Sequence, residues 1–228
     1  MLEIIYEDNH LLAVNKPAGM LAQGDITGDP NVVDELKSYR KRNENKPGEA
    51  FIGLVHRLDR PVSGVMVLAK TSKAAQRLCL GWHSPEVEKR YLAVVSRGPE
   101  LPPAEWTTWN DRLWKDQRTN TVKVYSLKDF PEGSLVASLQ IRTLKTIRLL
   151  AQLEVSLGSG RGHQIRVQLA SRGLPVVGDT KYGSATAYPS RSGFGRIALH
   201  ANYLQILHPT LKTPLVLQAP LPADWPFE

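Results

Sequence analysis

The densest group of reactive side chains in this 228-residue chain is the stretch HRLDRPVSG at residues 56–64. Its only carboxylate, Asp59, stands between Arg57 and Arg60, and the apolar run VMVLA follows at 65–69. In an extended segment, Arg57 and Asp59 would point to the same side, because residues i and i+2 share a face. An arginine beside a carboxylate keeps it ionised, which suits a nucleophile or an electrostatic stabiliser rather than a general acid. An exposed salt bridge would explain the same spacing.

Two further groups combine basic side chains with other polar groups. In EKRYLAVV, Tyr91 could stack on a base while the neighbouring cations hold phosphates, although many such tyrosines are ordinary half-buried strand residues. In GSGRGHQIRVQLA at 158–170, a glycine-rich turn precedes a helix start, where backbone amides favour anions and Arg161, His163 and Arg166 add donors. His163 and Arg166, three residues apart, would share one face of that helix.

The remaining polar residues do not match a metal site or a serine hydrolase. The chain has six histidines, but no pair has metal-ligand spacing and no carboxylate or cysteine cluster joins them. Ser63 is close to Asp59 and His56 in the sequence, yet no nucleophile-elbow pattern is present. We therefore expect neither a metal site nor a Ser-His-Asp triad.

Strands must position most of these residues. The β-prone runs at 2–8 and 11–17 predict a hairpin, and the apolar run at 65–69 predicts a strand buried on both faces. Further strands are predicted at 90–96, 121–126, 134–142, 147–156 and 197–207. The stretch 99–120 shows little periodicity.

Helices are predicted at three places. One begins after an Asp29 N-cap, one begins at a Ser72 cap, and one covers 161–172. The apolar side of the second helix comprises Ala75, Leu78, Cys79 and Trp82, which predicts that Cys79 is a core residue. Because strands outnumber helices and connections are short, we predict an α+β fold in a single catalytic domain over 1–228. Its central sheet is expected to be mixed and mostly antiparallel, with flanking helices.

The amino-acid composition indicates what kind of partner the protein binds and in which cellular compartment it is expected. The net charge of +7 and the isoelectric point of about 9.5 favour a polyanionic partner, most often nucleic acid. No apolar stretch approaches the roughly 20 residues that span a bilayer, and the acidic N-terminal stretch lacks a signal-peptide pattern. The single cysteine fits a reducing compartment. We expect a cytoplasmic protein that does not bind membranes.

The order and spacing of the motifs resemble the RluA-type pseudouridine synthases. The matching pieces are NKPAG at 15–19, HRLDRPVSGVMVLAK at 56–70, KRY at 89–91, GRGHQIRVQL at 160–169, VVGDTKYG at 176–183 and LHANYLQILHP at 199–209. The resemblance implies isomerisation of specific uridines in structured rRNA or tRNA to pseudouridine, without cofactor or metal. It implies a stand-alone catalytic domain without the additional RNA-binding S4 domain, and we expect a monomer with no obligatory protein partner.

The resemblance also implies roles for individual residues. Asp59 corresponds to the essential aspartate, Arg57 to the arginine that intrudes into the RNA stack, and Arg166 to the arginine that pairs with the aspartate. The expected substrate contacts are Arg57, Tyr91, Arg166, Arg161 and His163. An anionic Asp59 could stabilise or attack the ribose, or attack the base. The chain departs from the family pattern at Val62, Gly162 and Gln168, and the first two departures lead us to expect a looser site or altered RNA contacts.

Two other functions fit some of these residues. A catalytically inactive RNA-binding module would keep the same scaffold without turnover. A glycosidase would need a second acid near Asp59, and the basic surroundings of Asp59 disfavour that.

Overall fold

The computed structural model describes residues 2–44, 48–96, 98, 100–188 and 195–227. The chain divides into two compact units. The first consists of Met1–Lys89 and His200–Ala223, and the second of Arg90–Leu199 and Asp224–Glu228. The prediction of one catalytic domain over the whole chain stays a prediction. No helix in the described part of the chain is long and apolar enough to cross a membrane.

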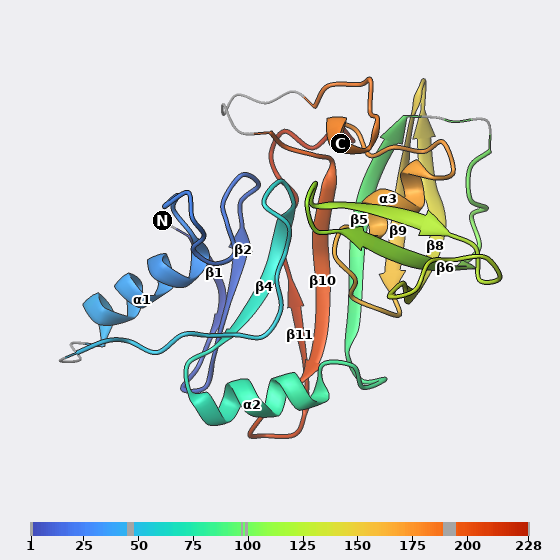
Figure 1. Cartoon of the computed structure of the whole chain (residues 1–228). Coiled ribbons are helices and arrows are strands. Elements are labelled where there is room, and N and C mark those ends of the chain that lie inside the picture. Colours follow the sequence, from blue (N-terminus) through green and yellow to red (C-terminus); the bar gives the residue numbers. More distant parts are fainter. Residues whose placement is uncertain (1, 45–47, 97, 99, 189–194, 228) are drawn as a thin grey trace. The chain divides into compact units, whose positions relative to one another are not determined.

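The first unit is built on strands that pair in the order β1, β2, β4 and β10 (Figure 1). Their bounds, with those of two shorter partners, are β1 Glu3–Glu7, β2 Leu11–Lys16, β3 Gly53–Leu54, β4 Ser63–Ala69, β10 Leu199–Leu207 and β11 Pro214–Gln218. β4 and β10 pair in parallel, and the other pairs are antiparallel. The predicted N-terminal hairpin is confirmed, as is the fully buried strand after the Asp59 motif.

The parallel junction between β4 and β10 requires a glycine. Ser63 and Gly64 pair with His200 and Ala201. Gly64 has a φ of 122°, and a Cβ atom there would meet the backbone of Ala201. The Ser-Gly pair at the end of the Asp59 motif is therefore the point at which the chain enters the sheet.

Two helices complete the first unit, α1 (Val32–Asn43) and α2 (Ser72–Gly81). The predicted N-caps were wrong. Asn31 caps α1 by accepting from Asp34 N at 3.0 Å, and Thr71 caps α2 by accepting from Ala74 N at 3.2 Å.

The prediction that Cys79 is a core residue was also wrong, because its side chain is exposed. The buried residues of α2 are Ala74 and Leu78, one turn apart, and their stripe points away from Cys79.

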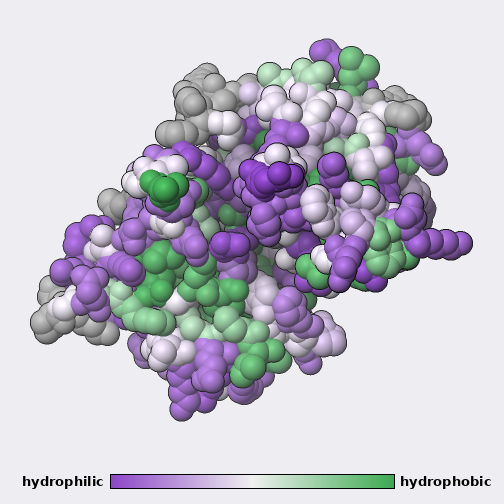
Figure 2. All heavy atoms as spheres, in the orientation of Figure 1, coloured by the Kyte–Doolittle hydropathy of each residue, from purple (hydrophilic) through white to green (hydrophobic). Residues whose placement is uncertain are grey.

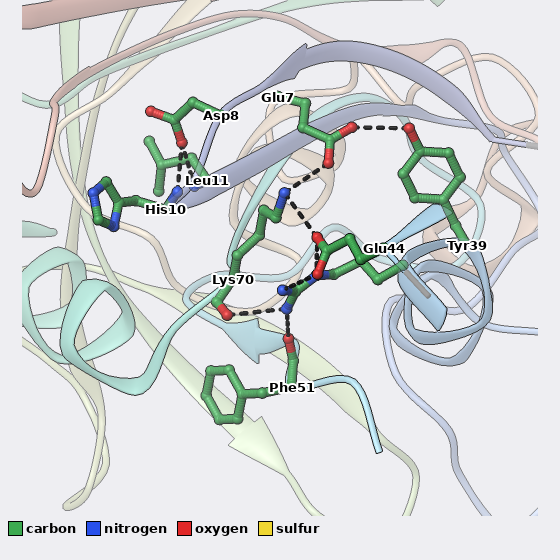
Figure 3. Close-up of polar contacts among 9 residues, drawn as sticks. Glu7, Asp8, His10, Leu11, Tyr39, Glu44, Phe51 and Lys70 are labelled. Carbon is green, nitrogen blue, oxygen red and sulfur yellow. Dashed lines mark hydrogen bonds and ion pairs between the residues drawn. The ribbon is translucent and has the colours of Figure 1, made fainter. Parts of the chain in front are cut away.

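A polar network fastens α1 to the sheet of the first unit (Figure 3). The buried Arg40 guanidinium contacts both carboxylate oxygens of Glu44 at 2.8 and 2.9 Å. The Lys70 ammonium contacts Glu44 at 3.0 Å and Glu7 at 2.7 Å, and the Tyr39 hydroxyl donates to Glu7 at 2.8 Å. The opposite charges compensate one another within the network, so its role is structural.

The second unit is a sheet of antiparallel strands in the order β5, β9, β8, β6 and β7. Their bounds are β5 Glu88–Ser96, β6 Thr107–Asp116, β7 Thr121–Tyr125, β8 Leu135–Ile147 and β9 Leu150–Leu157. The predicted strands are confirmed. β6 was missed because polar and aromatic residues occupy both of its faces, so its sequence lacks a clear apolar alternation.

One face of this sheet is covered by the short helix α3 (Gln164–Ala170). Leu113, Val122 and Ala137 of the sheet form a buried cluster with Val167 of α3. α3 is shorter than predicted because His163 has a φ of 55°, in the left-handed region, and therefore precedes the helix as its N-cap. A 3-10 turn, η1 (Thr180–Tyr182), lies beside α3. The predicted α+β class, with a mixed and mostly antiparallel sheet, is confirmed.

The surface of the molecule is mixed in polarity. On the face shown in Figure 2, hydrophobic residues gather over the first unit between α1 and α2, and hydrophilic residues cover much of the remaining surface. Phe51 in the segment before β3 is 46% exposed.

Candidate active site

Asp59 lies in an irregular segment between β3 and β4 in the first unit. Leu58 is buried and anchors the segment, whereas Arg57 is exposed and Asp59 is half-buried. The Val62 amide donates to the Asp59 carbonyl at 3.0 Å, which closes a turn immediately before β4. The backbone of Asp59 is thus fixed on both sides, by a core side chain and by the sheet.

Arg60 joins this segment to the NKPAG loop. Its Nε donates to the Gly19 carbonyl at 3.0 Å, and the Gly19 amide donates back to the Arg60 carbonyl at 2.7 Å. Its Nη1 contacts Asp29 at 2.8 Å, which explains why Asp29 does not cap α1. Arg60 therefore positions the loop that carries Asp59.

Lys16 was missed as a candidate residue in the sequence, and it is the most deeply buried cation near Asp59. Its side chain is 0% exposed, and its Nζ donates to the carbonyls of Pro17, Met20 and Arg60 at 3.0, 2.8 and 3.3 Å. Burial lowers the pKa of Lys16 to about 7, although nearby Asp59 acts in the opposite direction. Three carbonyl acceptors match the three donors of an ammonium group, so this geometry favours the charged form.

His56 of the same motif is a structural residue. Its Nε2 accepts from the Val67 amide at 3.0 Å, and its ring stacks on Trp82 with centroids 4.5 Å apart. Desolvation lowers the pKa of His56 to about 3, and the charge of Lys89 contributes in the same direction. A neutral His56 with an occupied Nε2 is poorly suited to proton transfer at neutral pH.

Ser63 and His200 form a pair that resembles part of a hydrolase triad but lacks its third member. His200 Nδ1 lies 2.9 Å from Ser63 Oγ, and its Nε2 lies 3.3 Å from the Ala219 carbonyl. A carbonyl accepts only, so Nε2 carries the proton and Nδ1 accepts from Ser63. Burial lowers the pKa of the fully buried His200 to about 4. A carbonyl replaces the carboxylate that a triad requires, which disfavours serine-hydrolase chemistry.

Arg166 is the centre of a second group of polar residues, in the second unit. It is 5% exposed and forms a bidentate ion pair with Asp179, with Nε and Nη2 at 2.6 and 2.9 Å from the two carboxylate oxygens. Its guanidinium also lies over the Tyr182 ring, 5.1 Å from the centroid. Asp179 and Tyr182 belong to the GDTKYG motif, and neither was predicted as a site residue. The predicted partner, Asp59, belongs to the first unit, so that pairing stays a prediction.

Of the other predicted site residues of the second unit, His163 lies beside Arg166, whereas Arg161 and Tyr91 make separate contacts. His163 Nδ1 lies 2.7 Å from the Tyr182 hydroxyl, so His163 and Arg166 both contact Tyr182, although His163 is not on the helix. Arg161 is exposed, and its Nε donates to the Val136 carbonyl of β8 at 3.2 Å. Tyr91 is half-buried on β5 and pairs with Val155, on the face of the sheet that α3 covers.

Of the three departures from the family pattern, Val62 and Gly162 fit their surroundings without a steric or polar conflict. Val62 is 3% exposed in the core, and no atom lies within 4 Å of a Cβ built on Gly162. Gln168 is fully buried and donates to Asp111 at 2.6 Å, whereas its Oε1 has no hydrogen-bond partner in the described part of the chain. Among the described residues, no group of three or more His, Cys, Asp or Glu side chains could hold a metal ion.

Comparisons with known proteins agree with these observations. The family model for RNA pseudouridylate synthase matches residues 10–171. Ribosomal large subunit pseudouridine synthase D of Xanthomonas campestris is 34% identical over 98% of this chain and 67% of its own length. Ribosomal large subunit pseudouridine synthase C of Vibrio cholerae is 32% identical over 96% and 66%. tRNA pseudouridine synthase C of Pectobacterium carotovorum is 33% identical over 99% and 60%.

A solved structure supports the fold. Human RNA Pseudouridylate Synthase Domain Containing 4 superposes with a TM-score of 0.75, at 24% identity, over 98% of this chain and 90% of that chain. The chain spans about two thirds of the length of the curated relatives. The chain belongs to the RluA-type RNA pseudouridine synthases, isomerases that convert uridine in RNA to pseudouridine.

Proposed function

We propose that Asp59 is the catalytic residue of this pseudouridine synthase and that Arg57, Tyr91, Arg166, Arg161 and His163 bind its RNA substrate. The observation that carries the proposal is the way Asp59 is held. Its loop is fixed through Arg60, which binds the Gly19 carbonyl and the Asp29 carboxylate, and through the buried Lys16, which donates to backbone carbonyls. This arrangement provides positive charge near Asp59.

The reaction accounts for the chemistry of these residues. It breaks the bond between ribose C1′ and base N1, rotates the uracil and rejoins it through C5, after which a proton leaves C5. No electrons are gained or lost, so the chemistry requires no redox cofactor. An ionised Asp59 could stabilise or attack the ribose, or attack the base. Arg166, aimed by its bidentate pair with Asp179, would contribute a fixed positive charge to the same step.

Access to the uridine requires base flipping, which costs a few kcal/mol for unstacking. The exposed guanidinium of Arg57 is suited to fill the vacated space, because it is planar and stacks on bases. Half-buried Tyr91 is suited to stack on the flipped uracil, a contact worth about 1–3 kcal/mol.

The substrate is proposed to be structured rRNA or tRNA. Relatives with similar identity are named for both classes of RNA, so the names alone do not choose between them. The net charge of +7 supports binding to either. We further propose a cytoplasmic monomer that acts without an obligatory protein partner.

Tritium release tests the proposal. RNA transcribed with 5-tritiated uridine releases tritium when C5 is glycosylated, and we expect Asp59→Asn to reduce release to background while RNA binding survives. Asp129→Asn, an exposed residue of the loop after β7, is the matched control and should retain turnover. Turnover in Asp59→Asn would contradict the role of Asp59. A wild-type protein that binds RNA but releases no tritium from any transcript would instead support an inactive RNA-binding module.

A further inference from the structure

The sheet of the second unit has an outer face that α3 does not cover. Directly paired residues on neighbouring strands point to the same side. Asp111 of β6 contacts Gln168 and Arg172, so the odd-numbered residues of β6 face α3. The even-numbered residues, such as Thr108 and Arg112, therefore point to the opposite side.

This outer face is accessible along most of β6 and β8. Thr108 and Asn110 of β6 and Val136 and Gln140 of β8 are all exposed, and Lys123 of β7 is exposed beside them. Thr108 pairs with Gln140, and Gln140 pairs in turn with Ser156 of β9. The middle of the face thus presents polar side chains that can donate and accept hydrogen bonds, Thr108, Asn110 and Gln140, next to the apolar Val136.

An arginine stacked on an aromatic ring stands at each end of this group of polar side chains. Arg142 lies over Trp106 at 4.7 Å, and Arg112 lies over Phe130 at 3.6 Å. Both rings remain more than a third exposed, at 37% and 38%. Each pair therefore presents a cation and an apolar ring surface together.

The charge of the outer face is positive. Its cations are Arg90, Arg112, Lys123 and Arg142. Among the described residues of β6–β9, the carboxylates on this face are Glu154 of β9, which is 8% exposed, and Asp116 at the end of β6. Arg142 binds Glu154 at 2.6 Å and Arg90 approaches it to 3.8 Å, so this carboxylate is compensated and the cations of the face outnumber its carboxylates.

We propose that the outer face of β6–β8 is a second RNA-binding surface, which takes a single-stranded segment of the substrate RNA away from the target uridine. The inference rests on the RNA substrate of the proposed function. Arginine and lysine would contact phosphates, the polar side chains would contact ribose and base edges, and the exposed rings would stack on bases. Tyr91 and Arg166 lie on the other face of the same sheet, so an RNA must extend well beyond the target site to reach both.

The composition of the face disfavours a protein partner. The cores of stable protein interfaces are depleted in charged residues and enriched in apolar area. Here the centre is mostly polar and the cations are concentrated at the ends. These properties fit a polyanionic strand better than a second copy of this basic chain.

A matched pair of double variants tests the proposal. Lys123→Glu with Gln140→Glu changes the outer face, and Lys73→Glu with Gln76→Glu makes the same chemical change on the exposed side of α2. Binding of a labelled 30-nucleotide, uridine-rich single strand should weaken about tenfold in the first variant, and its salt slope should fall by about 1. The control variant should change affinity by less than about twofold. Equal affinities for the two variants would overturn the proposal.

Two further measurements separate this inference from the proposed catalysis. Tritium release from a short stem-loop that contains the target uridine should be the same in both double variants. Trp114 pairs with Lys123, and Tyr125 pairs with Arg112, so both rings lie on the outer face. Photocross-linking of the Asp59→Asn protein to a 4-thiouridine strand should mark peptides that contain Trp106, Trp114 or Tyr125, whether or not the wild type is active. Absence of cross-links there, or a dimer in sedimentation that the outer-face variant abolishes, would contradict an RNA surface.

Discussion

At the scale of single residues, consecutive residues around Asp59 have different environments and different expected roles. Arg57 is exposed, Leu58 is buried and Arg60 is committed to Gly19 and Asp29. Neighbouring residues of like charge therefore have different roles, because alternate positions of the segment face solvent and protein.

Lys16 should be essential for holding this segment. Lys16→Met leaves the carbonyls of Pro17, Met20 and Arg60 without their donor, so we expect the free energy of unfolding to fall by about 3 kcal/mol. Urea unfolding measures this, and tritium release should fall as well. Lys37→Met on the exposed side of α1 is the control. Equal stability of the two variants would show that the three carbonyls are satisfied without Lys16.

Asp179 should fix the orientation of the Arg166 guanidinium. Asp179→Asn removes the charge that fixes Arg166 while keeping the shape of the side chain. We expect turnover to fall more than RNA affinity, because the Arg166 guanidinium keeps its charge but is no longer held in one orientation. Single-turnover tritium release and filter binding measure the two quantities. A variant with weakened binding and unchanged single-turnover rate would contradict a positioning role.

At the scale of elements, helix α3 and turn η1 act together. α3 supplies Arg166, η1 supplies Tyr182 and its N-cap residue Asp179, and the Tyr182 hydroxyl accepts from the Val122 amide of β7 at 3.0 Å. Short elements of this kind have little intrinsic stability. Their geometry depends on the side-chain contacts that join them to the sheet.

The junction of β4 and β10 makes the sharpest prediction at this scale. Gly64→Ala introduces a Cβ against the Ala201 backbone at a positive φ, and should lower the free energy of unfolding by at least about 2 kcal/mol. Gly162→Ser is the contrasting variant, because its added side chain meets open space and should change stability by less than about 0.5 kcal/mol. Thermal unfolding of both proteins checks this, and a stable Gly64→Ala protein would refute the tight junction.

At the scale of the whole molecule, buried neutral histidines should make the protein sensitive to acid. The pKa of His200 is about 4 in the folded state, below its ordinary value of 6.5. The unfolded chain therefore binds a proton between these values and the folded protein does not. The stability from a neutral His200 is present above pH 6.5 and is lost as the pH falls to about 4, a loss of about 3 kcal/mol.

His200→Gln should flatten this part of the stability profile. Unfolding free energies measured from pH 7 to pH 4 should decline less steeply in the variant than in the wild type. His83→Gln, at an exposed position, should leave the decline as it is. An unchanged slope in His200→Gln would mean that other groups carry the acid sensitivity.

The sequence by itself determined the family, most strands of both units except β6, and the role expected of Asp59. These features are local, because strand periodicity and motif spacing are written along the chain. Only the tertiary structure showed that Lys16 is buried against a carbonyl 44 residues away, that Arg60 binds the NKPAG loop, and that Asp179 fixes Arg166. It also exposed Cys79 and moved the cap of α1 from Asp29 to Asn31. Those outcomes depend on which distant groups a side chain meets, and burial and pairing are properties of the folded chain rather than of its local pattern.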